Sequence, residues 1–579
     1  MKLYLFCLIS IVYFSSCQAQ IPVESSKNHE ENVTLSFDAC INEYEKLANH
    51  KYAKLLEKGS TDVGKSLHVF LLSSSSNQNE NSLDDGKVNI LINNAIHPGE
   101  PCGVDASVMF VKTLLENKNL EEILSKVNIG IIPMYNIGGG LNRGCCSRAN
   151  QNGPMYYGFR GNARNLDLNR DFIKCDSENA KSFSRIYHYM RPHIFLDTHT
   201  SNGADYQYVM TLITTQPDKA TPVIKSYLNN NMVNDLYTKM DSVGYPMAPY
   251  VHTVGQTPDD GIKDYLETPR YSTGYAALFN ALAFVSEAHM LKSYEQRVQS
   301  TYELMLSLLN HSLENDILIK ENKVKADNYV SVLKTFEVEW ELDTTRFDMF
   351  NFLGYAAKYK KSEFSDNQRL YYDKEEPSEK AIKYFNRYLA SERVKAPEFY
   401  IVPQAWKEVI ERLKLNQVEY SVLTKDTTVE VEFYYIENVK TGERPYEGHY
   451  LHSNVELKTT TTSETFRKGD FLIRVNQKSN RYIVETLEPG AVDGFFAWNF
   501  FDEILQQKEW FSTYVFEDKA AEMLAANKEL EVEFKKKQSE DESFRTNQWA
   551  QLYWLYQRSE NYERTHNRYP IARYSPGRI

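Results

Sequence analysis

The sequence of 579 residues lacks three features that would assign it to common classes of protein. It contains no Cys-x-x-Cys pair, which argues against a zinc site built from cysteines. It has no long block of Lys and Arg and a formal net charge of -12, which together argue against a nucleic-acid partner. After the N-terminus, no segment is apolar over the ~20 residues that a membrane-spanning helix needs.

Cysteine is scarce as well, with seven in the whole chain. Two of them, Cys7 and Cys17, fall in the apolar N-terminal segment. The other five are an odd number, so at least one thiol is expected to stay free of intramolecular pairing. A disulfide from the adjacent Cys145 and Cys146 to Cys175 competes with a set of unpaired buried thiols. The five are Cys40, Cys102, Cys145, Cys146 and Cys175.

The N-terminal segment has the organisation of an export signal. Lys2 supplies the positive charge, residues 3–14 form the apolar run, and small residues follow. Cleavage after Ala19 would make 1–19 a signal peptide and release an exported protein. Cleavage before Cys17 would resemble a bacterial lipoprotein site and leave a lipid anchor on Cys17. Phe14 departs from the usual lipoprotein pattern.

The remaining chain has a globular composition, with 25% charged and 13% aromatic residues. At roughly 150 residues per domain, the length predicts two to four domains. Between residues 36 and 318, apolar runs typical of buried strands alternate with helical patterns, which favours an α/β sheet with ligands at the strand ends. The expected strands are 87–96, 127–135, 192–198 and 281–286, and the expected helices are 105–115 and 274–280.

The pattern changes after about residue 320, and 325–579 is predicted to be a β-rich module with helices and a helical tail. Residues 376–396, 403–414 and 515–565 read as helical. Four segments alternate like strands of an antiparallel sheet: 429–436, 450–459, 470–475 and 482–487. This region carries no chemical motif that names its function.

The motif His97-Pro98-Gly99-Glu100 directly follows an expected strand. A His and a Glu three residues apart on a tight turn can face one ion, although such a pair is often only a polar turn. A catalytic zinc usually takes three protein ligands and keeps one position for water. His199, at the end of another buried strand, is the best third candidate. Asp197 is expected either to orient an imidazole or to serve as a turn residue.

Two further elements fit the same chemistry. The run from Arg160 to Phe172 is rich in Arg, Asn and Asp, and guanidinium groups bind carboxylates and stabilise developing oxyanions. Its alternative is a solvated loop with internal ion pairs. Glu287 follows an apolar strand, where a carboxylate can take a proton from zinc-bound water and return it to a leaving amine.

Together these four elements resemble the zinc carboxypeptidase family, the carboxypeptidase A-like metallopeptidases, over about residues 36–315. The elements HxxE, R-x-N…DLNR, a strand-end histidine and a strand-end glutamate occur in the family's order. The resemblance implies an α/β/α sandwich around a mixed eight-stranded sheet, over a catalytic domain of 36–318. It also implies one Zn²⁺ ion per chain, bound by His97, Glu100 and His199.

The resemblance also implies roles for the remaining site residues. Arg160 matches the arginine that polarises the scissile carbonyl. Asn169 and Arg170 match the pair that grips the substrate's terminal carboxylate. Asp167 matches the outer acid that supports the first histidine, and Glu287 matches the general base.

Two features depart from the family pattern. The family has a mobile substrate-binding tyrosine, and here Tyr265, Tyr271 and Tyr275 all precede Glu287. Tyr271 is preferred, although all three are also candidates for packing. The long loop around Cys145 and Cys146 lies near the expected cleft, so the side-chain specificity stays open.

The expected function is therefore that of an exported zinc metallocarboxypeptidase acting on peptides with a free C-terminal carboxylate. One alternative is a zinc amidase or deacylase that acts on peptidoglycan stem peptides or N-acyl amino acids. A second alternative is a catalytically inert exported binding protein, which the complete residue set argues against. Zinc content and a panel of peptides and muropeptides distinguish the three.

Overall fold

The computed structural model describes residues 28–75, 83 and 85–576. The expected signal peptide 1–19, with the lipid anchor expected at Cys17, lies outside the described residues. Among the described helices, none combines the length and the apolar character needed to cross a membrane.

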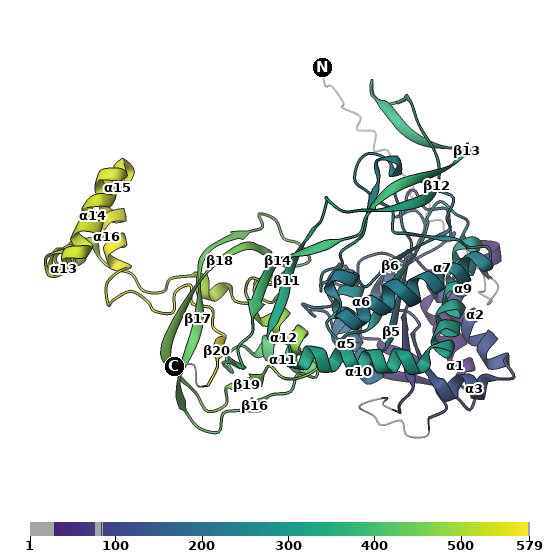
Figure 1. Ribbon diagram of the computed structural model, residues 1–579, viewed down its shortest axis with the longest axis horizontal. Helices are drawn as coiled ribbons and strands as arrows, with labels where there is room; N and C mark the ends of the chain where they lie inside the picture. Colours follow the sequence, from purple (N-terminus) through teal and green to yellow (C-terminus); the bar gives the residue numbers. More distant parts are fainter. Residues whose placement is uncertain (1–27, 76–82, 84, 577–579) are drawn as a thin grey trace, which may run out of the picture.

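A mixed eight-stranded sheet organises the first half of the chain, as the sequence predicts (Figure 1). Neighbouring strands β4, β3, β5 and β10 run parallel, and antiparallel partners flank them on both sides. Their carboxyl ends therefore meet at one edge, where ligands commonly bind. In spatial order the strands are β1 (Ala53–Ser60), β2 (Ser66–Leu72), β4 (Val127–Ile132), β3 (Val88–Asn93), β5 (Ile194–His199), β10 (Leu282–Ala288), β6 (Met210–Thr214) and β7 (Met247–Pro249).

The central strands are buried along their whole length because helices cover the sheet. Every residue of β3, β4 and β5 is buried, which explains why these strands are continuous apolar runs in the sequence. Helix α9 (Tyr294–Glu314) begins at a capping box formed by Ser293 and Gln296. It packs against α2 (Cys102–Glu116), β6 and β10, whereas α5 (Glu178–Met190) packs against β1, β2 and β3.

Shorter helices complete this catalytic region and lead out of it. They are α1 (Phe37–Leu47), α3 (Leu120–Lys126), α4 (Ile137–Leu141), α6 (Pro222–Tyr227), α7 (Val233–Ser242), α8 (Ser272–Ala277) and α10 (Asp316–Val332). Helix α10 spans the stretch where the sequence places the domain boundary, and it connects the two regions as one continuous rod (Figure 1).

A long hairpin from the second half returns to the first. Strands β12 (Asp348–Lys361) and β13 (Gln368–Phe385) pair with each other, and β13 then joins β9 (Ile262–Lys263), which pairs with β8 (His252–Thr253). A small separate core holds the base of the hairpin on the catalytic region, and it includes Tyr206, Tyr208, Phe352 and Ile382.

The C-terminal region is built on a six-stranded sheet, which confirms the predicted β-rich module with helices. Its spatial order is β16 (Ser421–Val422), β19 (Phe471–Arg474), β15 (Phe399–Val402), β20 (Ala572–Tyr574), β17 (Thr427–Thr441) and β18 (His452–Phe466). A two-stranded sheet of β11 (Thr335–Leu342) and β14 (Tyr388–Lys395) lies beside helices α11 (Lys407–Leu415) and α12 (Asn480–Leu487). Four further helices follow: α13 (Thr513–Ala526), α14 (Lys528–Glu540), α15 (Glu542–Arg545) and α16 (Gln548–Tyr556).

Two secondary-structure predictions are wrong. Residues 376–396, predicted helical, form the end of β13 and all of β14, because pairing with β12 and β11 overrides the helical preference of their Glu, Lys and Ala residues. Residues 482–487, predicted as a strand, lie in α12. All eight residues of α12 are buried, and a short apolar run buried on every side does not reveal its period.

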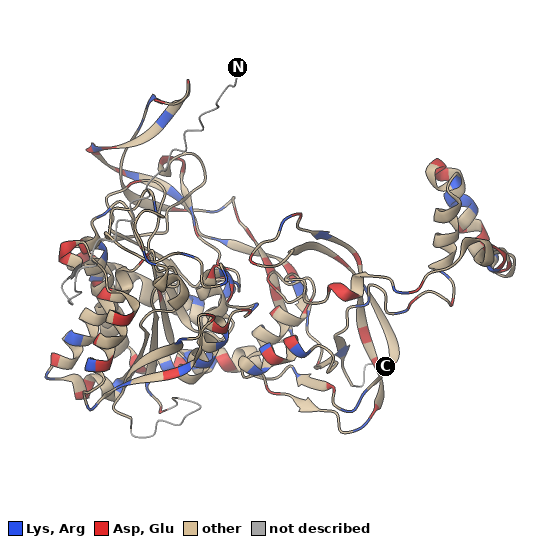
Figure 2. Ribbon diagram, turned by 180° about the vertical axis from the view of Figure 1, so that it is seen from behind, with Lys and Arg blue, Asp and Glu red and all other residues tan. Residues whose placement is uncertain are grey.

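The two regions share one hydrophobic core, which runs from Leu35 in the catalytic region to Ile571 near the end of the chain. Lys and Arg lie among Asp and Glu over both regions (Figure 2). Neither region is therefore marked as a separate charged module.

Candidate metal centre and active site

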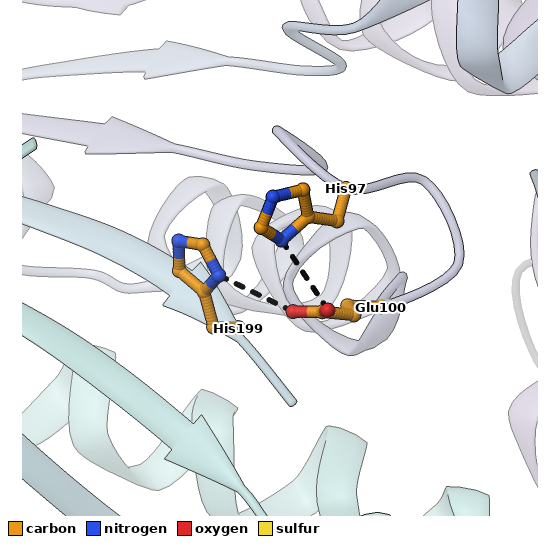
Figure 3. A group of neighbouring side chains, drawn as sticks. All are labelled: His97, Glu100 and His199. Atoms are coloured by element: carbon orange, nitrogen blue, oxygen red, sulfur yellow. Dashed lines mark hydrogen bonds and ion pairs between the residues drawn. The ribbon is translucent and has the colours of Figure 1, made fainter. Parts of the chain in front are cut away.

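Three side chains meet at the carboxyl edge of the sheet. The turn after β3 is closed by a hydrogen bond from the Glu100 amide to the His97 carbonyl (2.8 Å), and it carries both side chains. His199 is the last residue of β5, the parallel neighbour of β3. One ligand atom from each residue lies within 4.8 Å of the others, and all three side chains are buried. Figure 3 shows both imidazole rings directed at the carboxylate.

Two outer carboxylates orient these imidazoles. Asp167 lies 2.9 Å from His97 Nε2, and Asp197 lies 3.0 Å from His199 Nε2. Such partners fix the tautomer and leave the other ring nitrogen for a metal. The Nδ1 atoms accordingly face Glu100, at 3.3 Å from Oε1 for His97 and 3.2 Å from Oε2 for His199.

These residues fit a zinc ion. The buried Nδ1 of His97 makes no hydrogen bond within the described residues, which is unusual unless a ligand completes it. Burial raises the pKa of Glu100, but Arg148 and the two histidines outweigh it and hold this pKa well below its usual range. Two neutral nitrogens, one charged carboxylate and a fourth position open to a cavity are typical of catalytic zinc.

The three ligands border a cavity of about 340 Å³. Most of the other residues expected at the site line it too, namely Arg160, Asn169, Arg170, Tyr271 and Glu287. Asp167 and Asp197 lie behind the two histidines instead. The structure thus brings together residues that are up to 190 positions apart in the sequence, from His97 to Glu287.

Glu287 lies on β10 directly opposite His199 of β5. Its side chain is partly exposed to the cavity. Removal from bulk water raises the pKa of Glu287 to about 8; His199 opposes this shift, and the neighbouring Glu100 and Glu267 add to it. A carboxylate whose pKa lies above its ordinary value is suited to carry a proton near neutral pH.

Arg160 and Arg170 flank the same carboxylate, Asp167. Arg160 donates to Asp167 Oδ2 from Nε at 2.9 Å, and its Nη1 lies 3.5 Å from Glu100 Oε1. Arg170 donates from Nη1 to the carbonyl oxygen of Asn169 (2.8 Å). Its guanidinium carbon lies 4.5 Å from the ring centre of Tyr271.

The structure separates the three candidate tyrosines. Tyr265 and Tyr271 line the cavity, with ring centres 5.9 Å apart. Tyr275 is buried elsewhere, and its hydroxyl donates to Asn416 Oδ1 at 2.5 Å. Only the first two are therefore in a position to meet a ligand in this cavity.

Arg148, Tyr250 and Glu267 are among the cavity residues that the sequence did not reveal. Arg148 donates to Glu100 Oε1 at 2.7 Å, although it lies in a loop whose sequence carries no recognisable signal. Glu267 lies between two of the candidate tyrosines in the sequence, and this position is a signal from which its place in the cavity could have been predicted. Its Oε2 accepts from the Thr273 amide at 2.8 Å.

Neither of the two cysteine arrangements weighed from the sequence, a disulfide to Cys175 or a set of unpaired buried thiols, is found as such among the described residues. Cys145 and Cys146 are joined to each other instead, and Cys102 and Cys175 are buried free thiols. The bond therefore stiffens the Arg148 loop locally and does not tie it to the segment after Arg170. The prediction of at least one free thiol is confirmed.

Comparison of the chain with known proteins gives matches to carboxypeptidases. The family model described as zinc carboxypeptidase matches residues 41–347. Carboxypeptidase 2 of Trichophyton rubrum is 20% identical over 466 residues, covering 75% of this chain and 78% of the relative. Probable carboxypeptidase 2 of Trichophyton verrucosum is 21% identical over 460 residues, covering 74% and 79%. The crystal structure of carboxypeptidase A from Helicoverpa armigera matches at 14% identity, 49% and 74% coverage and a TM-score of 0.36.

The family model carries this assignment, since it covers just over half of the chain and includes the metal ligands and Glu287. The zinc site of His97, Glu100 and His199 is the one that the sequence predicts, and its geometry agrees with it. The chain therefore belongs to the zinc carboxypeptidase family.

Proposed function

We propose that the protein is a metallocarboxypeptidase that hydrolyses the last peptide bond of peptides with a free C-terminal carboxylate. The observation that carries the proposal is the shared cavity, in which the metal ligands, Glu287, Arg160 and the pair Asn169 and Arg170 all have surface. A peptide end in this cavity would meet both reacting groups and an anion-binding group.

His97, Glu100 and His199 would hold a zinc ion, which would act as a Lewis acid and make water a better nucleophile near neutral pH. Glu287 removes a proton from the attacking water and later delivers it to the leaving amine. Its raised pKa favours both transfers near neutral pH. Arg160, 44% exposed at the cavity, donates hydrogen bonds to the oxygen of the scissile carbonyl as negative charge develops on it.

Arg170 is suited to hold the terminal carboxylate. Its nearest acidic neighbour is Asp167, at 3.9 Å from Nη1, which leaves the guanidinium without a close carboxylate partner among the described residues. Asn169 lines the same cavity, and its side-chain amide nitrogen is a donor from which a carboxylate can accept. An arginine and an amide side by side can bind a carboxylate through several hydrogen bonds.

We also propose that the protein is exported, on the basis of the signal-like segment 1–19. N-terminal sequencing of the mature protein tests this. A mature chain that starts at Gln20 supports release, one that starts at a lipidated Cys17 supports anchoring, and an intact Met1 contradicts both.

A matched pair of peptides tests the activity. Both have the same sequence, but one ends in a carboxylate and the other in a carboxamide. The purified protein is assayed for zinc and incubated with each peptide, with and without a chelator, and the products are identified by mass spectrometry. We expect chelator-sensitive loss of single C-terminal residues from the carboxylate peptide. Cleavage of N-acyl amino acids or muropeptides alone would favour the amidase, and zinc without any cleavage would favour an inert binding protein.

A further inference from the structure

A turn of the C-terminal region contacts residues of the active site. It links β17 to β18 and consists of Tyr446, Glu447, Gly448 and His449. The amides of Tyr446 and His449 donate to each other's carbonyl oxygens, at 2.7 and 3.1 Å. The two central residues have φ values of 50° and 86°, as in two-residue hairpin turns of the primed type. Glycine adopts this conformation freely, whereas Glu447 does so at a cost that points to a function.

Two side chains of the turn contact the substrate-binding segment of the catalytic region. Arg170 donates from Nε to the hydroxyl oxygen of Tyr446 at 2.9 Å. Glu447 Oε2 accepts from the backbone amide of Asp167 at 2.8 Å. The turn therefore touches both the residue expected to grip the substrate and the residue that supports His97.

The turn is held in place by buried charge. His449 Nε2 lies 2.7 Å from Asp176 Oδ2, and its Nδ1 lies 2.6 Å from Asn499 Oδ1. Arg412 and Lys174 each lie 2.8 Å from the same Asp176 carboxylate. A turn anchored by this network keeps one position, so its contacts can orient other side chains.

The neighbouring Arg270 fixes the other face of the turn. Its guanidinium carbon lies 5.5 Å from the ring centre of Tyr446 and 4.9 Å from that of Trp498. Its Nε donates to Asp493 Oδ1 at 2.7 Å. The Tyr446 ring therefore contacts Arg270, while its hydroxyl accepts from Arg170.

We propose that Tyr446 and Glu447 are positioning residues for the terminal-carboxylate subsite, so that the C-terminal region helps to set the geometry of the active site. The proposal rests on the proposed role of Arg170. With Nε bonded to Tyr446 and Nη1 to the Asn169 carbonyl, Nη2 is left without a hydrogen-bond partner among the described residues. The contact with Tyr446 directs that free edge, and with it the preference for peptides that end in a carboxylate.

The test is the variant Tyr446→Phe, which removes the hydroxyl and keeps the ring. It is assayed on the carboxylate and carboxamide peptides described above. We expect KM for the carboxylate peptide to rise about tenfold with kcat changed less than about threefold, because ground-state and transition-state binding are weakened alike. The slower reaction on the carboxamide peptide is expected to stay unchanged. Tyr450→Phe, four residues along and 45% exposed, is the matched control.

Glu447 provides a second, independent variant. Glu447→Gln keeps an oxygen that can accept from the Asp167 amide, so it is expected to behave like the wild type. Glu447→Ala removes the acceptor and is expected to raise KM in the same direction as Tyr446→Phe. Thermal unfolding and zinc content of each variant identify any loss of fold.

The outcomes separate this proposal from the proposed function. If the wild type prefers the carboxylate peptide and Tyr446→Phe and Glu447→Ala keep that preference and the wild-type KM, the positioning role is overturned and the carboxypeptidase assignment stands. Equal losses on both peptides would also overturn it, since they indicate a purely structural role. If the wild type shows no preference for the carboxylate, the proposed function itself fails.

Discussion

The catalytic and C-terminal regions differ in where their strands place polar side chains. In the catalytic region, strands buried on every residue end in polar groups at a single edge, and these groups form the active site. In the C-terminal region, strands such as β18 alternate between more and less exposed residues along their length, as expected of an antiparallel sheet with one solvent-exposed face. The first arrangement concentrates reactive groups at one point, whereas the second spreads solvated side chains over the sheet, and the turn at Tyr446 brings two of its side chains against residues of the active site.

The boundary between the regions does not follow this division. One hydrophobic core crosses it, and so do ion pairs with buried partners, such as Arg270 with Asp493 and Arg412 with Asp176. Buried charges are costly unless they are paired, so each region removes a penalty that the other would suffer alone. The difference between the regions is therefore one of roles in catalysis and not of independent folding.

The largest expected effect comes from removing the reacting carboxylate of the catalytic region. Glu287→Gln is isosteric and is expected to lower kcat by about 10³-fold, within the usual range for loss of a general base. The three zinc ligands are untouched, so zinc content should stay at one ion per chain. Steady-state kinetics and metal analysis measure the two quantities.

Glu295→Gln is the matched control, since Glu295 is exposed eight residues away on α9. Turnover of Glu287→Gln close to that of this control would remove Glu287 from the proposed role. It would also undo the claim that chemistry is concentrated at the carboxyl edge of the sheet.

Sequence reasoning was strongest where function depends on strand ends. His97, Glu100, His199 and Glu287 each follow or end an apolar run, and parallel neighbours bring such ends together without further information. It failed where a contact depends on an approach between distant segments. Nothing local in the sequence links Tyr446 to Arg170, which lies 276 positions away.

Arg148 was missed for a similar reason, because its loop takes its shape from long-range contacts. The Arg148 amide donates to the Tyr157 hydroxyl, and the side chain reaches Glu100 across 48 positions. The segment 482–487, which was wrongly predicted as a strand, shows a second limit of prediction from sequence. Its residues are buried on all sides by both regions, so the pattern carries no period from which to choose helix or strand.

The shared boundary predicts a large loss of stability when a buried pair across it is broken. Asp493 has 1% of its surface exposed and accepts from the Arg270 amide and guanidinium. Asp493→Asn leaves Arg270 without its counter-charge and is expected to cost about 3 kcal/mol of unfolding free energy. Denaturant unfolding followed by fluorescence and by activity measures it.

The exposed pair of Asp426 and Arg467 provides the control, since Asp426 Oδ2 and Arg467 Nη1 lie 2.9 Å apart but both side chains are more than half exposed. Asp426→Asn is expected to leave the unfolding midpoint unchanged. If unfolding shows two transitions and Asp493→Asn shifts only the one that is not accompanied by loss of activity, the two regions unfold independently. The interpretation of a shared core would then be wrong.

A smaller, pH-dependent effect is expected at the anchor of the Tyr446 turn. Burial lowers the pKa of His449, but the bonds to Asp176 and Asn499 outweigh burial and the nearby Lys174, so the net pKa is raised. A raised histidine pKa stabilises the protein fully below the unfolded value of about 6.5, and the contribution is lost as pH rises through the folded pKa. His449→Gln should therefore cost about 1–2 kcal/mol at low pH and less as pH rises.

Thermal unfolding of the wild type and His449→Gln across this pH range checks the sign. His50→Gln, just after α1 in the catalytic region, serves as the control. A difference between the wild type and His449→Gln that grows with pH would show that the histidine is neutral in the folded protein. The charged anchor of the turn would then have to be assigned to Arg412 and Lys174 alone.

The smallest effect is expected from the four helices α13–α16. They form a separate hydrophobic cluster and stand apart from the rest of the chain (Figure 1). The segments that enter and leave this bundle meet where the Lys508 amide donates to Glu563 at 2.6 Å, so a short Gly-Ser linker can replace residues 511–560. Because the deletion leaves the cavity and the Tyr446 turn intact, kcat/KM on the carboxylate peptide should stay within about twofold. A tenfold loss would mean that support of the active site extends beyond the turn, and that the C-terminal region contributes to catalysis as a whole.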